Sequence, residues 1–255
     1  MIDLAKKMLP DPLKEIMRGI YSRLAYFAGA KYHCPVCGRH VLAFNRFPRF
    51  YLDNQQKFGY PYAPSQHETC NGEAYLCPLC GASDRERFYA RYILDDLWPA
   101  WQGETKSILD IAPSRPLAQF IRRLILTSGF QVSYRTADLY MDGVDDRVDI
   151  TDMHLYRDNQ FDFFICSHVL EHVADDRQAL RELYRILKPL GRGILMVPIV
   201  LGVEDIDEDP TVTDPAERWR RFGQDDHVRL YSKAGFMNRV SGAGFQIHQY
   251  DWSCF

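Results

Sequence analysis

From residue 107 to the end of the chain, short apolar runs alternate with amphipathic segments. The apolar runs predict strands and the amphipathic segments predict helices, since a half-buried helix repeats its apolar positions every three to four residues. Ser114 and Asp175 precede the two clearest helical patterns and are expected to cap them. The predicted strands are residues 107–112, 131–139, 147–152, 161–167, 191–200 and 244–252, and the predicted helices are residues 114–126 and 175–191.

This alternation indicates an α/β protein whose parallel sheet carries helices on both faces. In open sheets of this kind, ligands bind beyond the carboxyl ends of the strands. Asp110 stands at the end of the first predicted strand and Asp138 at the end of the second. A carboxylate after the second strand is placed to accept hydrogen bonds from ribose hydroxyls. Asp149 and Asp152, at the third strand, are placed to meet an adenine edge.

Residues 1–30 form a separate N-terminal helical segment in this interpretation. Its polar side carries Lys14, Arg18 and Arg23. We expect its apolar side to pack on the main body, and the alternative is a helix on a membrane surface or a partner. The apolar positions are Leu13, Ile16, Met17, Ile20, Leu24 and Phe27.

Residues 31–83 lack a long helical period and contain two similar pentapeptides, CPVCG and CPLCG. A C-x-x-C turn brings two thiolates to one ion, and the following glycine permits the tight backbone of such a turn. The 39 residues between the pairs exceed the roughly 15 to 20 of a usual zinc site, which an inserted loop explains because loop-closure entropy grows slowly with length. We therefore predict a small zinc-ribbon-like knuckle module with a structural Zn²⁺ bound by Cys34, Cys37, Cys77 and Cys80.

Composition narrows the class of protein further. Hydrophobic residues make up 46% of the 255 residues and charged residues 25%, as in ordinary globular proteins. A net charge of −3 gives no overall basic field that would attract nucleic acid. No apolar run of about 18 residues predicts a transmembrane helix, and no secretory leader opens the chain. We expect a cytoplasmic protein with reduced thiols.

Four stretches of the sequence together resemble a class I S-adenosylmethionine-dependent methyltransferase. These are ILDIAPS, TADL, VDITDM and the run from FDFFICSHVLEH to GRGILMVPI. The likeness covers roughly residues 105–250 and is greatest with the bacterial branch related to ubiquinone and menaquinone methyltransferases. It implies a Rossmann-like seven-stranded sheet with an antiparallel last pair, in a methyltransferase domain of residues 84–255. The stretch FGQDDHVRLYSKAGF also resembles members that carry CPxCG knuckles in front.

The resemblance implies a site for S-adenosylmethionine. Asp110 and the turn after it would line the methionine end, Asp138 would hold the ribose, and residues 149–151 would flank the adenine. Ser167 and His168 would lie under the sulfonium, at the mouth of the active site. The implied cofactor-binding residues are Asp110, Ile111, Ala112, Pro113, Ser114, Asp138, Leu139, Asp149, Ile150, Thr151, Ser167 and His168.

The first loop of this family is normally rich in glycine, whereas this chain reads DIAPSRP. Glycine lets the backbone approach a cofactor closely, so we expect the small Ala112 to take its place and Pro113 to stiffen the turn. The missing glycines also argue against a dinucleotide dehydrogenase, which needs G-x-G-x-x-G. A catalytically inactive methyltransferase-like scaffold that only binds a partner is an alternative.

The stretch HVLEH has the H-x-x-E-H spacing of inverted zinc proteases. That function needs both histidines on one helix, but a predicted strand ends just before His168, and the helical period starts only near Asp175. We therefore expect His168 in a strand-to-helix turn. The candidate catalytic residues are His168, Glu171, His172 and His227.

Two roles of this turn stay open. It supports the cofactor, or it forms with His227 a Mg²⁺ or Mn²⁺ site that gathers acceptor hydroxyls, as in relatives with a similar E-x-x-E-H run. Without metal, His172 or His227 is the expected general base, since an imidazole pKa near 6.5 suits deprotonation of a hydroxyl.

The expected reaction is methyl transfer to an oxygen of a sugar, glycan precursor or other small metabolite. Residues 204–209 hold five carboxylates and are expected to overhang the active site, which disfavours a nucleic acid substrate. A solvated loop without any substrate role fits equally well. The remaining alternative is methylation of RNA, with the zinc module binding the RNA.

Overall fold

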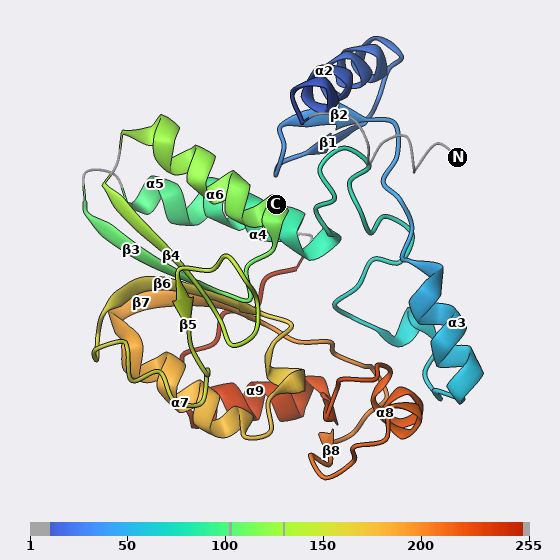
Figure 1. The fold of residues 1–255 in the computed structure, drawn as a ribbon, viewed down its shortest axis with the longest axis vertical. Helices are drawn as coiled ribbons and strands as arrows, with labels where there is room; N and C mark the ends of the chain where they lie inside the picture. The colour runs from blue at the N-terminus through green and yellow to red at the C-terminus, as the bar shows by residue number, and fades with distance from the viewer. Residues whose placement is uncertain (1–10, 102–103, 130, 252–255) are drawn as a thin grey trace.

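The computed structural model describes residues 11–101, 104–129 and 131–251 (Figure 1). Its helices are α2 (Asp11–Phe27), α3 (Arg49–Phe58), α4 (Asp84–Tyr92), α5 (Trp98–Ala100), α6 (Arg115–Ser128), α7 (Asp176–Ile186), α8 (Pro215–Phe222) and α9 (Lys233–Gly242), with shorter turns η1 (Pro64–Gln66), η2 (Ile93–Leu97) and η3 (Leu170–His172). Its strands are β1 (Tyr32–Cys34), β2 (Arg39–Val41), β3 (Lys106–Ile111), β4 (Val132–Asp138), β5 (Asp146–Arg147), β6 (Phe161–Ser167), β7 (Leu187–Met196), β8 (Asp207–Glu208) and β9 (Arg229–Leu230).

A five-stranded sheet forms the centre of the molecule, in the order β5-β4-β3-β6-β7. Every neighbouring pair in it is parallel. Helices α4, α5 and α6 cover one face and α7 and α9 the other (Figure 1). This confirms the predicted α/β class with a Rossmann-like sheet. The chain leaves β3 toward β4 on one side and returns to β6 on the other, so the carboxyl ends of β3 and β6 form the switch point at which sheets of this kind commonly bind ligands.

The burial pattern explains why these residues form strands. Ile108, Phe163 and Ile165 pack toward α4 and α6, whereas their neighbours Leu109 and Phe164 pack toward α7. Successive side chains of a strand point to opposite faces, so a sheet covered on both sides needs apolar residues at consecutive positions. The continuous apolar run of β6 meets this requirement.

The described residues give five strands in this sheet, so the predicted seven strands and antiparallel last pair are wrong for this part of the chain. Residues 244–251 form no strand. Phe245 instead packs its ring on Phe164 and Tyr184, at centroid distances of 5.9 and 5.2 Å. Its burial therefore comes from side-chain packing without backbone pairing. The predicted strand at 147–152 shortens to Asp146–Arg147, and the helix predicted to run to 191 ends at Ile186, where β7 follows directly.

Helix α2 does not bury its apolar stripe as expected. The helix rests on the β1–β2 hairpin through its other side, where Ala25 is buried and Ser22 Oγ accepts a hydrogen bond from His40 N. The stripe faces away from the hairpin, with exposed fractions from 43% at Leu13 to 84% at Phe27. Within the described part of the chain, no helix is long and apolar enough to cross a lipid bilayer.

The segment between the two cysteine pairs, residues 38–76, is more than a connecting loop. It carries α3, which lies beside α8 (Figure 1), with the ring of Phe58 stacked on Trp219 at 6.2 Å. Farther along, Glu68 N donates to Ile199 O at 3.0 Å, and Leu201 N donates to Gln66 O at 2.7 Å. The segment is therefore bound to the chain that follows β7.

Candidate functional site

Parallel strands bring the predicted acidic residues to one edge of the sheet. Asp110, near the end of β3, is only 2% exposed and accepts a hydrogen bond from the Tyr134 hydroxyl at 2.6 Å. Burial raises the pKa of Asp110 to about 7, although the Tyr134 hydroxyl opposes the rise. This carboxyl therefore changes charge near neutral pH.

The turn after β3 adopts a backbone that glycine normally supplies. Ala112 has a φ of 52°, in the left-handed region that disfavours residues with a Cβ. Ser114 then caps α6 by accepting a hydrogen bond from Leu117 N at 3.3 Å, as predicted. Ala112 thus replaces a glycine in conformation, at a cost in strain.

The loops after β4 and β5 use part of their carboxylates to hold their own backbone. Asp138 Oδ1 accepts hydrogen bonds from Tyr140 N at 2.7 Å and Met141 N at 2.6 Å. Asp149 Oδ1 accepts from the backbone N and hydroxyl of Thr151. Of the remaining residues in these loops, Ile150 is buried and Leu139 is exposed.

The HVLEH stretch is a turn, as expected. Strand β6 ends at Ser167, His168 has a left-handed φ of 57°, and η3 follows with Glu171 and His172. Helix α7 starts only at Asp176, so the two histidines do not share the helix that a protease would require.

Glu171, His172 and His227 converge next to this turn. Their potential ligand atoms all lie within 4.8 Å of one another. His168 Nδ1 lies 3.2 Å from Glu171 Oε1. Two contacts with backbone atoms hold His227 beside Glu171. Val228 N donates a hydrogen bond to Glu171 O at 2.9 Å, and His227 Nδ1 lies 3.2 Å from Phe222 O.

The electrostatics of this cluster favour an ionised Glu171 beside a neutral His227. Glu171 is 1% exposed, and burial alone would raise its pKa, but nearby His168, His227 and His172 outweigh burial and bring the pKa to about 2. Burial lowers the pKa of the 3% exposed His227 to about 4. His227 is thus neutral at physiological pH, and it is a weaker base than an ordinary imidazole.

The four cysteines of the two knuckles also converge. Their sulfur atoms lie within 4.8 Å of one another, and Cys34 Sγ is 3.8 Å from Cys80 Sγ. Gly38 and Gly81, the residues after each pair, have φ values of 66° and 80°, which only glycine adopts readily. Four sulfurs in this arrangement could hold a metal ion.

Two residues of α4 reach the sheet edge and were missed from the sequence. Glu86, only 6% exposed, accepts hydrogen bonds from Ser83 N and from the Ser114 hydroxyl. The Tyr89 hydroxyl is hydrogen-bonded to Ser167 Oγ at 2.7 Å. The capping-box sequence SDRE signals the helix start at Ser83, but no local signal indicates that Glu86 also bonds the turn after β3.

The acidic loop mostly serves the structure. Asp207 and Asp209 pair with Arg221, and Glu208 pairs with Arg229 and Arg239. These pairs neutralise three of the five carboxylates, so the expected repulsion of a polyanion loses most of its basis.

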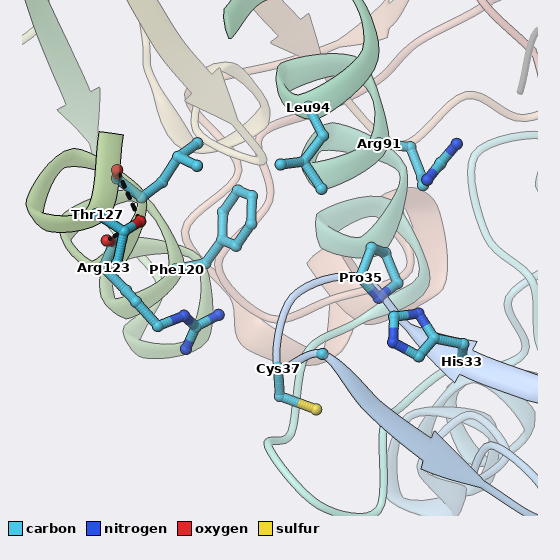
Figure 2. Close-up of a pocket in the computed structure, with 10 residues that line it drawn as sticks. His33, Pro35, Cys37, Arg91, Leu94, Phe120, Arg123 and Thr127 are labelled. Atoms are coloured by element: carbon cyan, nitrogen blue, oxygen red, sulfur yellow. Dashed lines mark hydrogen bonds between the residues drawn. The ribbon is translucent and has the colours of Figure 1, made fainter. Parts of the chain in front are cut away.

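A pocket of about 400 Å³ lies elsewhere, between the first knuckle, α4 and η2, and the later part of α6 (Figure 2). Figure 2 shows Pro35 and Cys37 facing Leu94 and Phe120 across it. Because its α6 residues run from Phe120 to Thr127, the pocket lies away from the turn at Ser114. It does not include the edge described above.

Comparison with protein families gives one match. Residues 113–195 match a family model described as a methyltransferase domain. This segment runs from the turn after β3 into β7 and includes the HVLEH turn. Comparison with curated protein sequences gives no match.

Solved structures similar to this chain include three methyltransferases. The citrinin polyketide synthase CMeT domain is 16% identical, with 64% of this chain and 45% of that chain covered and a TM-score of 0.41. Phosphoethanolamine N-methyltransferase 2 of Haemonchus contortus, solved with S-adenosyl-L-methionine, is 14% identical, with 65% of this chain and 37% of that chain covered and a TM-score of 0.40. The trans-methyltransferase CalH, solved with SAH, is 17% identical, with 63% of this chain and 52% of that chain covered and a TM-score of 0.39. This chain thus spans about half of their lengths or less.

Proposed function

We propose that this protein transfers a methyl group from S-adenosylmethionine to a hydroxyl oxygen of a small molecule, such as a sugar or a glycan precursor. The observation that carries the proposal is the placement of Glu171 and His172 directly after β6, within the segment that matches a methyltransferase domain, with His227 from beyond that segment beside them. The cofactor would supply an electrophilic methyl carbon on its sulfonium. The residues of the chain would align the acceptor and manage its proton.

The cofactor would lie across the carboxyl ends of β3, β4 and β6. Asp110 would face the ammonium of the methionine part, and Ser167, held by Tyr89, would lie under the sulfonium. Asp138 would bind the ribose through Oδ2, because Oδ1 already accepts two backbone hydrogen bonds. Asp149, Ile150 and Thr151 would flank the adenine.

The buried cluster suits a divalent cation more than a general base. Oε2 of Glu171 and Nε2 of His227 have no hydrogen-bond partner, and buried polar atoms of this kind normally have one. Imidazole ligands disfavour Mg²⁺, which prefers oxygen ligands, so a transition metal such as Fe²⁺, Zn²⁺ or Mn²⁺ fits better. Such an ion lowers the pKa of a bound hydroxyl. Glu171, His172 and His227 would hold it, and His168 would orient Glu171.

The cysteine cluster would hold a structural Zn²⁺. Four buried or half-buried sulfurs complete a tetrahedral set and leave no open position for a substrate. The module would then fix the start of α4, which follows the second knuckle and supplies Glu86 and Tyr89 to the cofactor site.

Replacement of His227 tests the proposal. His227→Ala should abolish methyl transfer and weaken Mn²⁺ binding, measured by the paramagnetic resonance of free Mn²⁺, while affinity for S-adenosylhomocysteine stays within about twofold. His154→Ala is the control, because His154 is 73% exposed and lies outside the cluster. If His227→Ala keeps wild-type turnover, the cluster does not act on the acceptor.

Turnover also separates the other two functions. A scaffold would bind S-adenosylhomocysteine but release none from S-adenosylmethionine with any acceptor. An RNA methyltransferase would bind RNA with an affinity that falls steeply with salt.

A further inference from the structure

Five side chains among the described residues bury a polar atom that lacks a hydrogen-bond partner. They are Tyr60, His67, His168, Glu171 and His227. Glu171 and His227 belong to the cluster at the end of β6, and His168 lies beside it. The other two come from the segment between the cysteine pairs, which no feature of the sequence connects with the active site. Native proteins leave few such atoms unpaired, and an unpaired one commonly indicates a place where a ligand, an ion or a water binds.

Tyr60 and His67 lie against the elements that also hold His227. Tyr60, which is 9% exposed, packs with Val200 and with Phe222 at the end of α8. The carbonyl of Phe222 is in turn the partner of His227 Nδ1. His67 forms an isolated antiparallel bridge with Val200, and its ring centroid is 5.9 Å from that of Tyr60.

The segment that carries both side chains is held firmly. The Thr69 hydroxyl donates to Val197 O at 3.2 Å and accepts from Ile199 N at 3.1 Å. Lys233 Nζ pairs with Glu68 at 2.6 Å. Backbone and side-chain bonds on both sides of His67 thus fix its place beside the chain after β7. Residues fixed this way can select a ligand without a large ordering cost.

We propose that Tyr60 and His67 bind the methyl acceptor, and that this acceptor is an uncharged ring with several hydroxyl groups, as in a sugar. The inference rests on the proposed function and names its substrate class. A phenol hydroxyl and a neutral imidazole each donate and accept hydrogen bonds, which matches sugar hydroxyls. Burial lowers the pKa of His67, so this ring is neutral. The aromatic face of Tyr60 adds apolar surface.

A first test needs no acceptor. If the Tyr60 hydroxyl awaits a ligand, Tyr60→Phe removes an unpaired buried group and should raise the melting temperature by about 2–6 °C. Tyr62→Phe is the matched control, since Tyr62 lies in the same segment and is not among the unpaired side chains; it should leave the temperature unchanged. A lower melting temperature for Tyr60→Phe would mean that the hydroxyl has a structural partner, and would overturn its assignment to the acceptor.

A second test measures the acceptor directly. A panel of monosaccharides and sugar nucleotides is incubated with wild type and radiolabelled S-adenosylmethionine. For the sugar that is methylated, Tyr60→Phe and His67→Leu should each raise KM about tenfold, with unchanged affinity for S-adenosylhomocysteine, while Tyr62→Phe leaves KM unchanged. Unchanged KM in both variants would overturn this inference and leave the proposed function standing. Absence of methylation for every sugar, together with no Mn²⁺ binding at the Glu171 cluster, would overturn both.

Discussion

Replacing Glu86 with alanine would break a connection between two helix starts. Its carboxylate accepts hydrogen bonds from Ser83 N, at the cap of α4, and from the Ser114 hydroxyl, at the cap of α6. Hydrogen bonds to a charged group contribute about 1.5–3 kcal/mol each, so two of them give about 3–6 kcal/mol. Removal of a nearly buried charge recovers part of this, because its desolvation cost disappears. We expect a net loss of about 2–4 kcal/mol, and about 2–4 °C in melting temperature for each kcal/mol.

Urea denaturation of single and double variants measures this connection. If Glu86 acts through Ser114, the double variant Glu86→Ala/Ser114→Ala should lose at least about 1 kcal/mol less than the two single losses combined. Because Ser114 also follows the turn at Ala112, Glu86→Ala should weaken S-adenosylhomocysteine binding about tenfold in calorimetry. Glu73→Ala, at a 78% exposed side chain, is the control. Single losses that add within about 0.5 kcal/mol, with unchanged affinity, would refute the reasoning.

Three further outcomes are expected. Cys37→Ser should reduce bound zinc well below one ion per chain and lower the melting temperature in elemental and thermal analysis, whereas Cys70→Ser, outside the four-sulfur cluster, should retain the zinc. Since the pKa of Asp110 is raised to about 7, its carboxyl is mostly neutral at pH 6 and mostly ionised at pH 8. Calorimetric affinity for S-adenosylhomocysteine, whose ammonium would pair with the carboxylate, should therefore rise severalfold over this range, and a flat profile in wild type would contradict that pairing; Asp110→Asn should remove the dependence. Ala112→Gly relieves a left-handed strain of about 1–2 kcal/mol against about 0.4–1 kcal/mol of added unfolded-state entropy, so urea denaturation should find it as stable as wild type or up to about 1.5 kcal/mol more stable. A less stable Ala112→Gly variant would show that the methyl group makes contacts worth more than the strain.

Local signals in the sequence predicted those parts of the fold that local physics decides. Strand β6 has the predicted bounds of residues 161–167, and Ser114 and Asp175 cap their helices as expected. The exposed stripe of α2 and the missing strand near Phe245 depend on which surface lies opposite, and periodicity carries no such information. Both patterns are compatible with burial against a partner or with exposure.

Some residues of the candidate site could likewise be named from the sequence, whereas others could be found only in the folded structure. The acidic residues at strand ends and the HVLEH turn follow from the order of the elements, so the sequence sufficed to name them. Glu86, Tyr60 and His67 come from segments before the sheet, and only the folded chain brings them toward it. His227 could be named as a candidate, but its lowered pKa depends on complete burial, which the sequence does not reveal.

The two cysteine pairs have a consequence for how this protein could diversify. They join the ends of the segment between them, since Cys34 Sγ and Cys80 Sγ are 3.8 Å apart. A segment with joined ends can change in length and sequence at little entropic cost, because closing a longer loop adds only about 0.6 kcal/mol for each doubling. If residues 38–76 bind the acceptor as proposed, new acceptors could be acquired by exchange of this segment, provided that its contacts with α8 and with the chain after β7 are kept. A chimaera that carries this segment from a relative with another acceptor would then be expected to bind S-adenosylhomocysteine like wild type and to differ only in the acceptor it methylates.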